Sequence, residues 1–152
     1  MSTDITISYN KNKKALTFYE ILDKIEAGIQ LTGGEVKSVK AGHVNLKGSY
    51  IDIGDHAAWL RNANVSRFPY DNNPLETTRV RKLLLHKVQL LKLEQQQEEK
   101  GITLIPLEIY GKKNLIKVLI GICRGKKMHD RRDDLKKKAQ DLDVKRALKK
   151  YE

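Results

Sequence analysis

Short runs of β-branched and other apolar residues, broken by glycine-containing turns, constrain the fold of this chain more than any other feature of its sequence. Residues 18–31 combine alternation with a central glycine, which is typical of a bent or bulged strand. Two pairs of shorter runs follow, and each pair is separated by a glycine turn that predicts a hairpin. The paired runs are residues 49–53 with 57–65 and residues 102–110 with 115–123. The pattern therefore predicts a mainly β protein.

Two segments have a helical rather than an alternating pattern. Two valines spaced three residues apart precede Gly42, which predicts a short helix over residues 35–41 with a glycine cap. Residues 79–99 contain no glycine or proline and are rich in leucine, so they predict one long helix. Its core-facing side is expected to hold Val80, Leu83, Lys87, Leu90 and Leu91. Residues 67–78 contain two prolines and two asparagines, which indicates an exposed loop.

Several short strands, with one longer helix before the last pair, favour a small closed antiparallel β-barrel of the OB type with short flanking helices. We expect three parts along the chain. These are a flexible basic N-terminal arm over residues 1–16, the barrel domain over residues 17–124 and a basic tail over residues 125–152. Cys123 lies in an apolar run near the end of the barrel, where a buried small hydrophobe is expected rather than a nucleophile.

The charge of the chain indicates the chemistry of its partner. Lysine and arginine number 30 against 19 aspartate and glutamate residues, for a formal net charge of +11. Because cationic side chains neutralise phosphates, this surplus favours RNA or DNA over an anionic membrane. The first residues lack a signal-peptide pattern, and no apolar stretch is long enough to span a bilayer. We therefore expect a cytoplasmic protein that does not act at a membrane.

The tail has many charges and few groups to bury. Its residues Leu135, Ala139 and Leu142 recur at helical spacing, but this stripe is too narrow to hold a helix by itself. We expect the tail to be disordered when free and to order on a polyanionic partner. Acidic residues dilute its charge, so a merely solubilising extension is the alternative.

The sequence offers little for catalysis. It has no Cys/His zinc spacing, no glycine-rich phosphate loop and no nucleophile elbow, so we expect no metal, no cofactor and no enzymatic activity. A nuclease that uses His86 and His129 as general acid and base is the enzymatic alternative. For binding, residues 79–87 place cations beside His86, whose ring can stack on a base. A solvated charged face is an equally good interpretation of that stretch.

Six ordered motifs carry a resemblance to a known family. They are Asn12-Lys13-Lys14-Ala15, Glu26-Ala27-Gly28, Gly34-Glu35-Val36-Lys37-Ser38, Arg81-Lys82-Leu83-Leu84-Leu85-His86, Thr103-Leu104-Ile105-Pro106-Leu107 and Gly125-Lys126-Lys127-Met128-His129-Asp130-Arg131-Arg132. Through these motifs the chain closely resembles the small protein B family of SsrA-binding proteins, over nearly its whole length.

The resemblance implies an RNA-binding adaptor. Members of that family bind transfer-messenger RNA and act in trans-translation, in which a ribosome stalled without a stop codon is rescued and its nascent chain is tagged. The barrel is then expected to grip the tRNA-like domain of the RNA. Glu26, Leu84 and His86 match that surface, and Lys82 and Lys87 are expected to contact phosphates around His86. Leu84 is the unusual member, because a leucine is more often a core residue.

The resemblance also implies a second surface on the tail, which enters the empty mRNA path of the small ribosomal subunit near the decoding centre. Gly125 is expected to act as a hinge, and His129 to stack on a base of ribosomal RNA. The remaining tail residues of the match are Lys126, Lys127, Asp130, Arg131, Arg132, Ala147 and Leu148. We expect a monomer. A structural ribosomal protein that binds ribosomal RNA is the alternative from another functional class.

Overall fold

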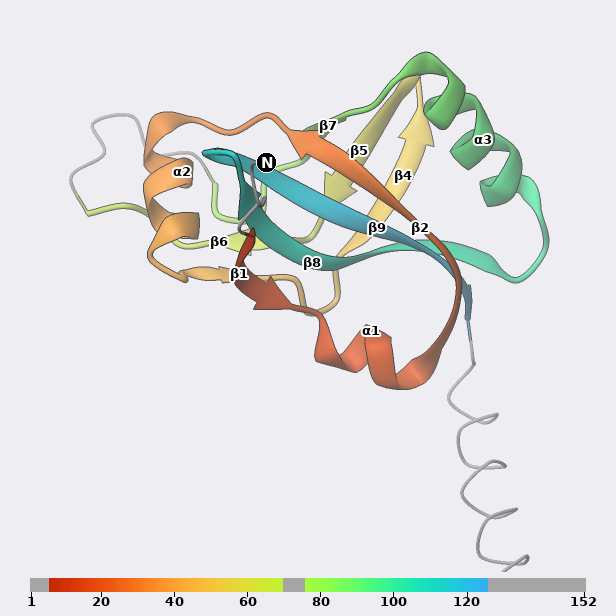
Figure 1. The fold of residues 1–152 in the computed structure, drawn as a ribbon, viewed down its shortest axis with the longest axis horizontal. Coiled ribbons are helices and arrows are strands. Elements are labelled where there is room, and N and C mark those ends of the chain that lie inside the picture. Colours follow the sequence, from red (N-terminus) through yellow and green to blue (C-terminus); the bar gives the residue numbers. More distant parts are fainter. Residues whose placement is uncertain (1–5, 70–75, 126–152) are drawn as a thin grey trace, which may run out of the picture.

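The computed structural model describes residues 6–69 and 76–125, in which a curved antiparallel sheet is flanked by three helices (Figure 1). The strands are β1 (Thr6–Lys11), β2 (Tyr19–Ile29), β3 (Val44–Asn45), β4 (Tyr50–Gly54), β5 (Ala57–Arg61), β6 (Asn64–Val65), β7 (Arg81–Leu84), β8 (Ile102–Lys112) and β9 (Leu115–Gly125). The helices are α1 (Lys13–Phe18), α2 (Gly33–Lys40) and α3 (Lys87–Glu98). Helices α2 and α3 lie at opposite ends of the sheet in this view, with α1 below it.

The seven-stranded sheet has the order β1-β8-β9-β2-β7-β5-β4, and every pairing in it is antiparallel. Strands β3 and β6 form a separate small pair. The mainly β prediction is thus confirmed. Among the described residues the strand order runs from one edge to another, so the hydrogen bonding shows no closed barrel. The sheet is curved, and its edge strand β4 packs against β8.

Strands β8 and β9 form the long hairpin that the sequence predicts, and both contribute residues to the core. Its tip places Lys113 and Asn114 at positive φ, which is the backbone of a two-residue type I′ turn. Both strands are largely buried, with consecutive buried residues at 104–107 and 120–123, and Val118, Ile120 and Ile122 are at most 1% exposed. Cys123 is also fully buried, which confirms the prediction of a small hydrophobe. Burial raises the pKa of its thiol to about 11, so the thiol stays protonated at neutral pH.

The prediction of a flexible arm over residues 1–16 is wrong for its described part. Residues 6–11 are strand β1, which pairs with β8. Asn12 then caps α1, because its Oδ1 accepts a hydrogen bond from the Ala15 backbone at 3.2 Å. Its Nδ2 donates to the carbonyls of Leu46 and Pro106, so one buried amide ties the chain start to two distant segments. Because this edge strand carries polar side chains, the sequence pattern did not predict its pairing.

The prediction of one long helix over residues 79–99 is also wrong. Residues 81–84 form strand β7, and the helix begins only at Lys87. Arg81 and Leu83 are buried whereas Lys82 and Leu84 are exposed, which is the alternation of a strand. Leucines at 83, 84, 90 and 91 fit either period, and pairing of β7 with β2 and β5 favours the strand. Of the expected core-facing side, Leu83 is buried, but Val80 and Leu91 are 41% and 50% exposed.

The remaining elements follow the predictions more closely. Strands β4 and β5 form the expected hairpin, with Asp55 and His56 at positive φ in its turn. The second run of that hairpin is shorter than predicted, because Asn62 also has positive φ and ends the strand before β6 begins. The bulge expected in β2 occurs between Ile21 and Asp23. The described part of the loop over residues 67–78 contains no helix or strand.

Helix α2 confirms the short helix and begins two residues earlier than predicted. A capping box starts it: the Thr32 hydroxyl accepts from the Glu35 backbone, and the Glu35 carboxylate accepts from the Thr32 backbone. Gly42 follows the helix with φ +82°, a conformation that favours glycine. No helix in the described ranges is both long and apolar enough to cross a membrane.

A buried ion cluster joins α2 to β7. The Arg81 side chain is 0% exposed and donates from Nε to Glu35 Oε2 at 2.8 Å. Its Nη1 donates to the carbonyls of Ala63 and Arg79, and its Nη2 donates to the Thr77 carbonyl and lies 2.7 Å from Glu35 Oε2. The guanidinium therefore makes four hydrogen bonds and an ion pair while fully buried. Arg79 pairs with the other oxygen of Glu35 at 2.5 Å.

We expect Arg81→Met to destabilise the protein by about 3 kcal/mol, because it removes one of the two cationic partners of the buried Glu35 carboxylate and the side-chain donor of the Ala63 and Arg79 carbonyls. Urea denaturation followed by circular dichroism measures this free energy of unfolding. Arg61→Met is the matched control, since its pair with Asp52 is 39% and 42% exposed. The control should lose less than about 1 kcal/mol. Equal losses in the two variants contradict the assigned role of Arg81.

The same cluster makes stability depend on acid pH. Burial alone raises the pKa of the Glu35 carboxyl, but hydrogen bonds from Arg79, the Thr32 backbone and Arg81 outweigh burial and hold this pKa below its ordinary 4.5. The stabilisation is therefore complete above pH 4.5 and is lost as the pH falls through the lower, folded pKa. We expect the difference in unfolding free energy between wild type and Glu35→Gln to be constant near pH 7 and to shrink in acid. A difference that is unchanged or larger in acid contradicts this sign.

Candidate functional site

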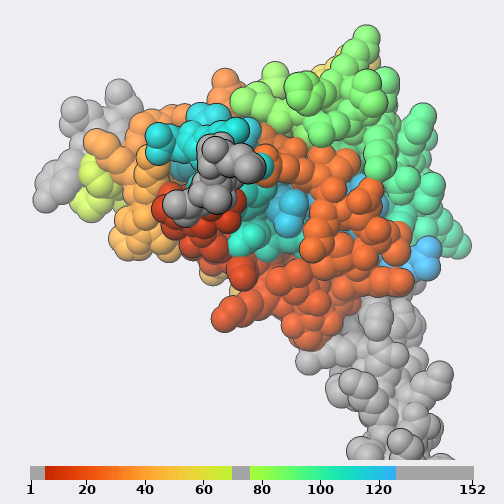
Figure 2. Space-filling view, viewed as in Figure 1, coloured from red at the N-terminus to blue at the C-terminus, as the bar shows by residue number. Residues whose placement is uncertain are grey.

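A hollow of about 470 Å³ lies where β2, β7, β9 and the start of α3 meet. Figure 2 shows this face of the molecule, with β2 in orange and β7 with α3 in green. The hollow is lined by Glu26, Gly28, Leu84, Leu85, His86, Gln89 and Lys117. It thus brings together three of the predicted site residues, Glu26, Leu84 and His86.

Leu84 is exposed because of the way in which β7 pairs with its neighbours. Leu84 is the last residue of β7 and lies opposite Gly28 of β2. Since Arg81 and Leu83 face the core, Leu84 faces outward and 52% of it is exposed. A Cβ added at Gly28 would lie 3.3 Å from Leu84 Cβ, so the missing side chain leaves room at the floor of the hollow. The leucine is a surface residue and not a core residue.

A second hollow, of about 210 Å³, continues this surface across β7 toward the β4–β5 turn. Lys82 and Leu84 line it together with His56, whose position in the turn the sequence did not single out. Lys82 lies opposite Trp59 of β5 and is exposed. The predicted cation at position 82 is therefore beside Leu84 on the same outward face.

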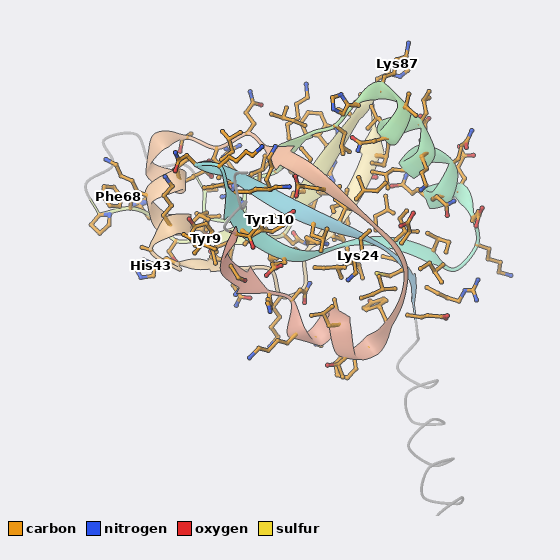
Figure 3. All side chains as sticks on the ribbon, viewed as in Figure 1. Tyr9, Lys24, His43, Phe68, Lys87 and Tyr110 are labelled. Atoms are coloured by element: carbon orange, nitrogen blue, oxygen red, sulfur yellow. The ribbon has the colours of Figure 1, made fainter. Side chains whose placement is uncertain are left out.

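His86 and Lys87 occupy the corner where β7 ends and α3 begins. His86 is the N-cap residue of α3, and its backbone N–H donates to Gln89 Oε1 at 3.1 Å. Lys87 is the first residue of the helix, and Figure 3 shows it at the outer end of this corner. Both side chains are exposed. The helix itself is fixed to β2 by an ion pair of Lys92 with Asp23 at 2.7 Å.

The Glu26 carboxylate is held from the opposite side by residues of β8. The Tyr110 hydroxyl donates a hydrogen bond to Glu26 Oε2, and Lys112 Nζ lies 3.6 Å from the same oxygen. Burial and the neighbouring Glu26 carboxylate raise the pKa of the Tyr110 hydroxyl, which therefore remains a donor at neutral pH. A half-buried acceptor is thus presented within a cationic surface.

Lys117, Gln89 and Gly28 are members of the hollow that the sequence reasoning missed. Lys117 lies opposite both Gly28 of β2 and Tyr110 of β8. The alternation of residues 115–123 could have identified it, because Lys117 is the polar position between buried Ile116 and Val118. Taken together, the surface offers one carboxylate acceptor, one imidazole, one exposed leucine and several lysines. Such a set suits folded RNA better than chemistry on a small molecule.

Most of the predicted tail site lies outside the described residues. Gly125 is the last residue of β9, pairs with Tyr19 of β2 and donates its backbone N–H to the Gly101 carbonyl. The undescribed positions are Lys126, Lys127, His129, Asp130, Arg131, Arg132, Ala147 and Leu148. The pairing of His86 with His129 in a nuclease is untested for the same reason. Within residues 6–69 and 76–125 no cluster of histidine, cysteine or carboxylate side chains could hold a metal ion.

A larger hollow of about 710 Å³ lies between α1, the turn before β4 and strand β8. Its lining includes the aromatic rings of Phe18, Tyr19 and Tyr50. None of the predicted site residues in the described ranges belongs to its lining, so it is separate from the surface around Leu84.

Comparison with known proteins gives a consistent family. The family model for SmpB protein matches residues 9–150 of the chain. The chain is 46% identical over 144 residues to an SsrA-binding protein of Gloeothece citriformis, with 92% of each chain covered. It is 44% identical over 142 residues to an SsrA-binding protein of Streptococcus suis, with 91% of this chain and 90% of that protein covered. A solved structure described as "tmRNA-SmpB: a journey to the center of the bacterial ribosome" matches with a TM-score of 0.66 and 42% identity, over 78% of this chain and 85% of that chain.

The strand assignment of β7 predicts opposite behaviour for two adjacent leucines. Leu83 is 2% exposed, so Leu83→Ala should cost about 2–5 kcal/mol of unfolding free energy. Leu84 is 52% exposed, so Leu84→Ala should stay within about 0.5 kcal/mol of wild type. Urea denaturation of the two variants measures both values. Comparable losses at both positions contradict the alternation of β7.

Proposed function

The chain belongs to the SmpB protein family, and from this premise we propose that the surface around Leu84 is where it binds transfer-messenger RNA, the SsrA RNA of its relatives' names. The protein is a non-enzymatic RNA-binding protein of trans-translation, and it acts together with that RNA on the ribosome. The proposal concerns which residues do so and how.

One observation carries the site assignment. Glu26, Leu84 and His86 come from β2, from β7 and from the cap of α3, yet they line one hollow. The sequence separates the first of them from the other two by more than fifty positions. Convergence of an acceptor, an apolar group and a ring in one place supports their joint use in binding.

The chemistry of the hollow suits shape recognition of a folded RNA. The exposed Leu84 side chain offers an apolar surface on which a nucleotide can pack. The His86 ring can stack on a base, and Glu26 can accept from a base N–H or a ribose hydroxyl. Lys82, Lys87 and Lys117 surround these groups and can neutralise phosphates.

We further propose that the sheet acts as an OB-like binding face, although its pairing shows an open strand order. The packing of β4 against β8 supports a barrel-like curvature. Glu26, Gly28, Leu84 and Lys117 of the hollow are held by paired strands, and His86 is held as the N-cap of α3.

The tail forms the second half of the proposal. Residues 125–152 are proposed to contact ribosomal RNA in the mRNA path, where lysines and arginines of the tail meet phosphates and His129 stacks on a base. Of the predicted division, the proposal keeps an RNA-binding body, which now begins with β1, and a ribosome-binding tail.

The two-surface proposal predicts separable losses. His86→Ala should weaken binding of the tRNA-like domain of transfer-messenger RNA about tenfold, because one stacking contact is removed. Truncation after Gly125 should leave this affinity within about twofold and abolish tagging on stalled ribosomes. Equilibrium binding at a fixed salt concentration and a peptide-tagging assay measure the two quantities.

Leu84→Ser tests the apolar surface of that leucine, and Leu16→Ser is its matched control. Leu16 is an exposed leucine on α1, 44% exposed, and does not line the hollow. Only the first variant should lose affinity. Loss of RNA binding on truncation overturns the separation of the surfaces, and wild-type affinity in both His86→Ala and Leu84→Ser overturns the site. Stoichiometric sedimentation with all ribosomes, without preference for the tRNA-like RNA, indicates the structural ribosomal alternative.

A further inference from the structure

We propose that Tyr110 and Lys112 are positioning residues for Glu26. They hold its carboxylate so that one oxygen is free to accept a hydrogen bond from the bound RNA. This inference rests on the proposed function of the surface around Leu84. It assigns a role to two residues of β8 that do not line the hollow themselves.

The geometry spans three neighbouring strands. Tyr110 lies opposite Lys117 of β9, which in turn lies opposite Gly28 of β2, two residues from Glu26. These side chains share one face of the sheet, because residues two apart on a strand point to the same side. Figure 3 shows Tyr110 within the sheet, and its residue is only 7% exposed. Packing therefore restricts the ring and fixes the place of its hydroxyl.

The contacts from Tyr110 and Lys112 make the two oxygens of the Glu26 carboxylate inequivalent. In the described part of the chain, the Tyr110 hydrogen bond and the Lys112 ion pair both fall on Glu26 Oε2. Oε1 is left to accept from a ligand, and the carboxylate plane is set by the bonds to Oε2. A free glutamate on a strand loses rotamer entropy when it binds, whereas a held one has already lost it.

The negative charge of Glu26 determines which chemical groups of the RNA it can bind. A carboxylate repels phosphates, so Glu26 gains nothing from the RNA backbone anions. It can accept from a base amino group or from a ribose 2′-hydroxyl, and both occur on exposed nucleotides of a folded RNA. Leu84 and His86 in the same hollow can hold such a nucleotide by packing and stacking.

The test is a double-mutant cycle on the full chain with the tRNA-like domain of transfer-messenger RNA. Tyr110→Phe keeps the ring and removes the donor, and it should weaken binding about tenfold in the wild-type background. In the Glu26→Ala background the same change should have no further effect, because Tyr110 acts through that carboxylate. Tyr50→Phe, which removes a hydroxyl from a 40% exposed tyrosine on β4, is the matched control.

Nucleotide-analogue interference identifies the donor and supplies a readout that a purely structural role does not change. The RNA carries an analogue that lacks the base amino group (inosine for guanosine, purine riboside for adenosine, pyrimidin-2-one riboside for cytidine) or a 2′-deoxynucleotide, and it is bound by wild type and by Glu26→Ala. A position at which loss of the amino group weakens only the wild type identifies a base amino donor, and one at which the deoxynucleotide does so identifies a ribose hydroxyl. If no position distinguishes the two proteins, the inference is overturned.

The remaining outcomes also decide the question. Wild-type affinity in Tyr110→Phe, or an equal loss in both backgrounds, overturns the positioning role. Wild-type affinity in Glu26→Ala overturns the inference as well, and the proposed function is then judged separately by His86→Ala and Leu84→Ser. Failure of all three variants to affect binding is the distinct result that refutes the site itself.

Discussion

The buried guanidinium of Arg81 is the interaction on which the rest of this structure depends. It makes hydrogen bonds to Glu35 of α2, to the carbonyl before β6 and to two carbonyls of the segment that leads into β7. Once Arg81 points inward, alternation requires Lys82 and Leu84 to point outward. A shift of one residue would bury Lys82 and Leu84 and expose Arg81. An ion cluster at one end of β7 thus determines which side chains its other end presents.

This dependence gives the candidate site a rigid base. Leu84 and Gly28 face each other across paired strands, and Lys92 and Gln97 fix α3 to β2 and β4. An exposed leucine beside a glycine contributes little to stability, which agrees with the proposed use of this surface in binding. If RNA binds here as proposed, these groups are already positioned, so less ordering opposes binding.

The sequence predicted the strands and helices whose patterns are local, and missed those that depend on distant partners. The β8–β9 hairpin and α2 follow from alternation, turns and a cap within a few residues. Strand β7 could not be predicted in this way, because the leucines at 83 and 84 fit a helix equally well and the evidence against it is Glu35, 46 positions from Arg81. Likewise β1 is a polar edge strand, recognisable only by its pairing with β8. The resemblance pointed to Glu26, Leu84 and His86. Alternation could show that Lys117 faces outward, but only the strand register places it beside Gly28 in the hollow.

The Glu26 carboxylate lies on the surface of a chain of net charge +11, and in the proposed function it affects which RNAs this surface distinguishes. Lysines around the hollow attract any polyanion, so their contribution to affinity is shared by all RNAs and weakens with salt. Glu26 opposes that attraction unless a donor meets its free oxygen. In the proposed complex, an RNA that supplies the donor gains a hydrogen bond to this oxygen, and one that does not leaves the oxygen desolvated without a donor. Under this proposal Glu26, held by Tyr110, adds affinity only for an RNA that carries the matching donor, and so contributes to the choice among RNAs.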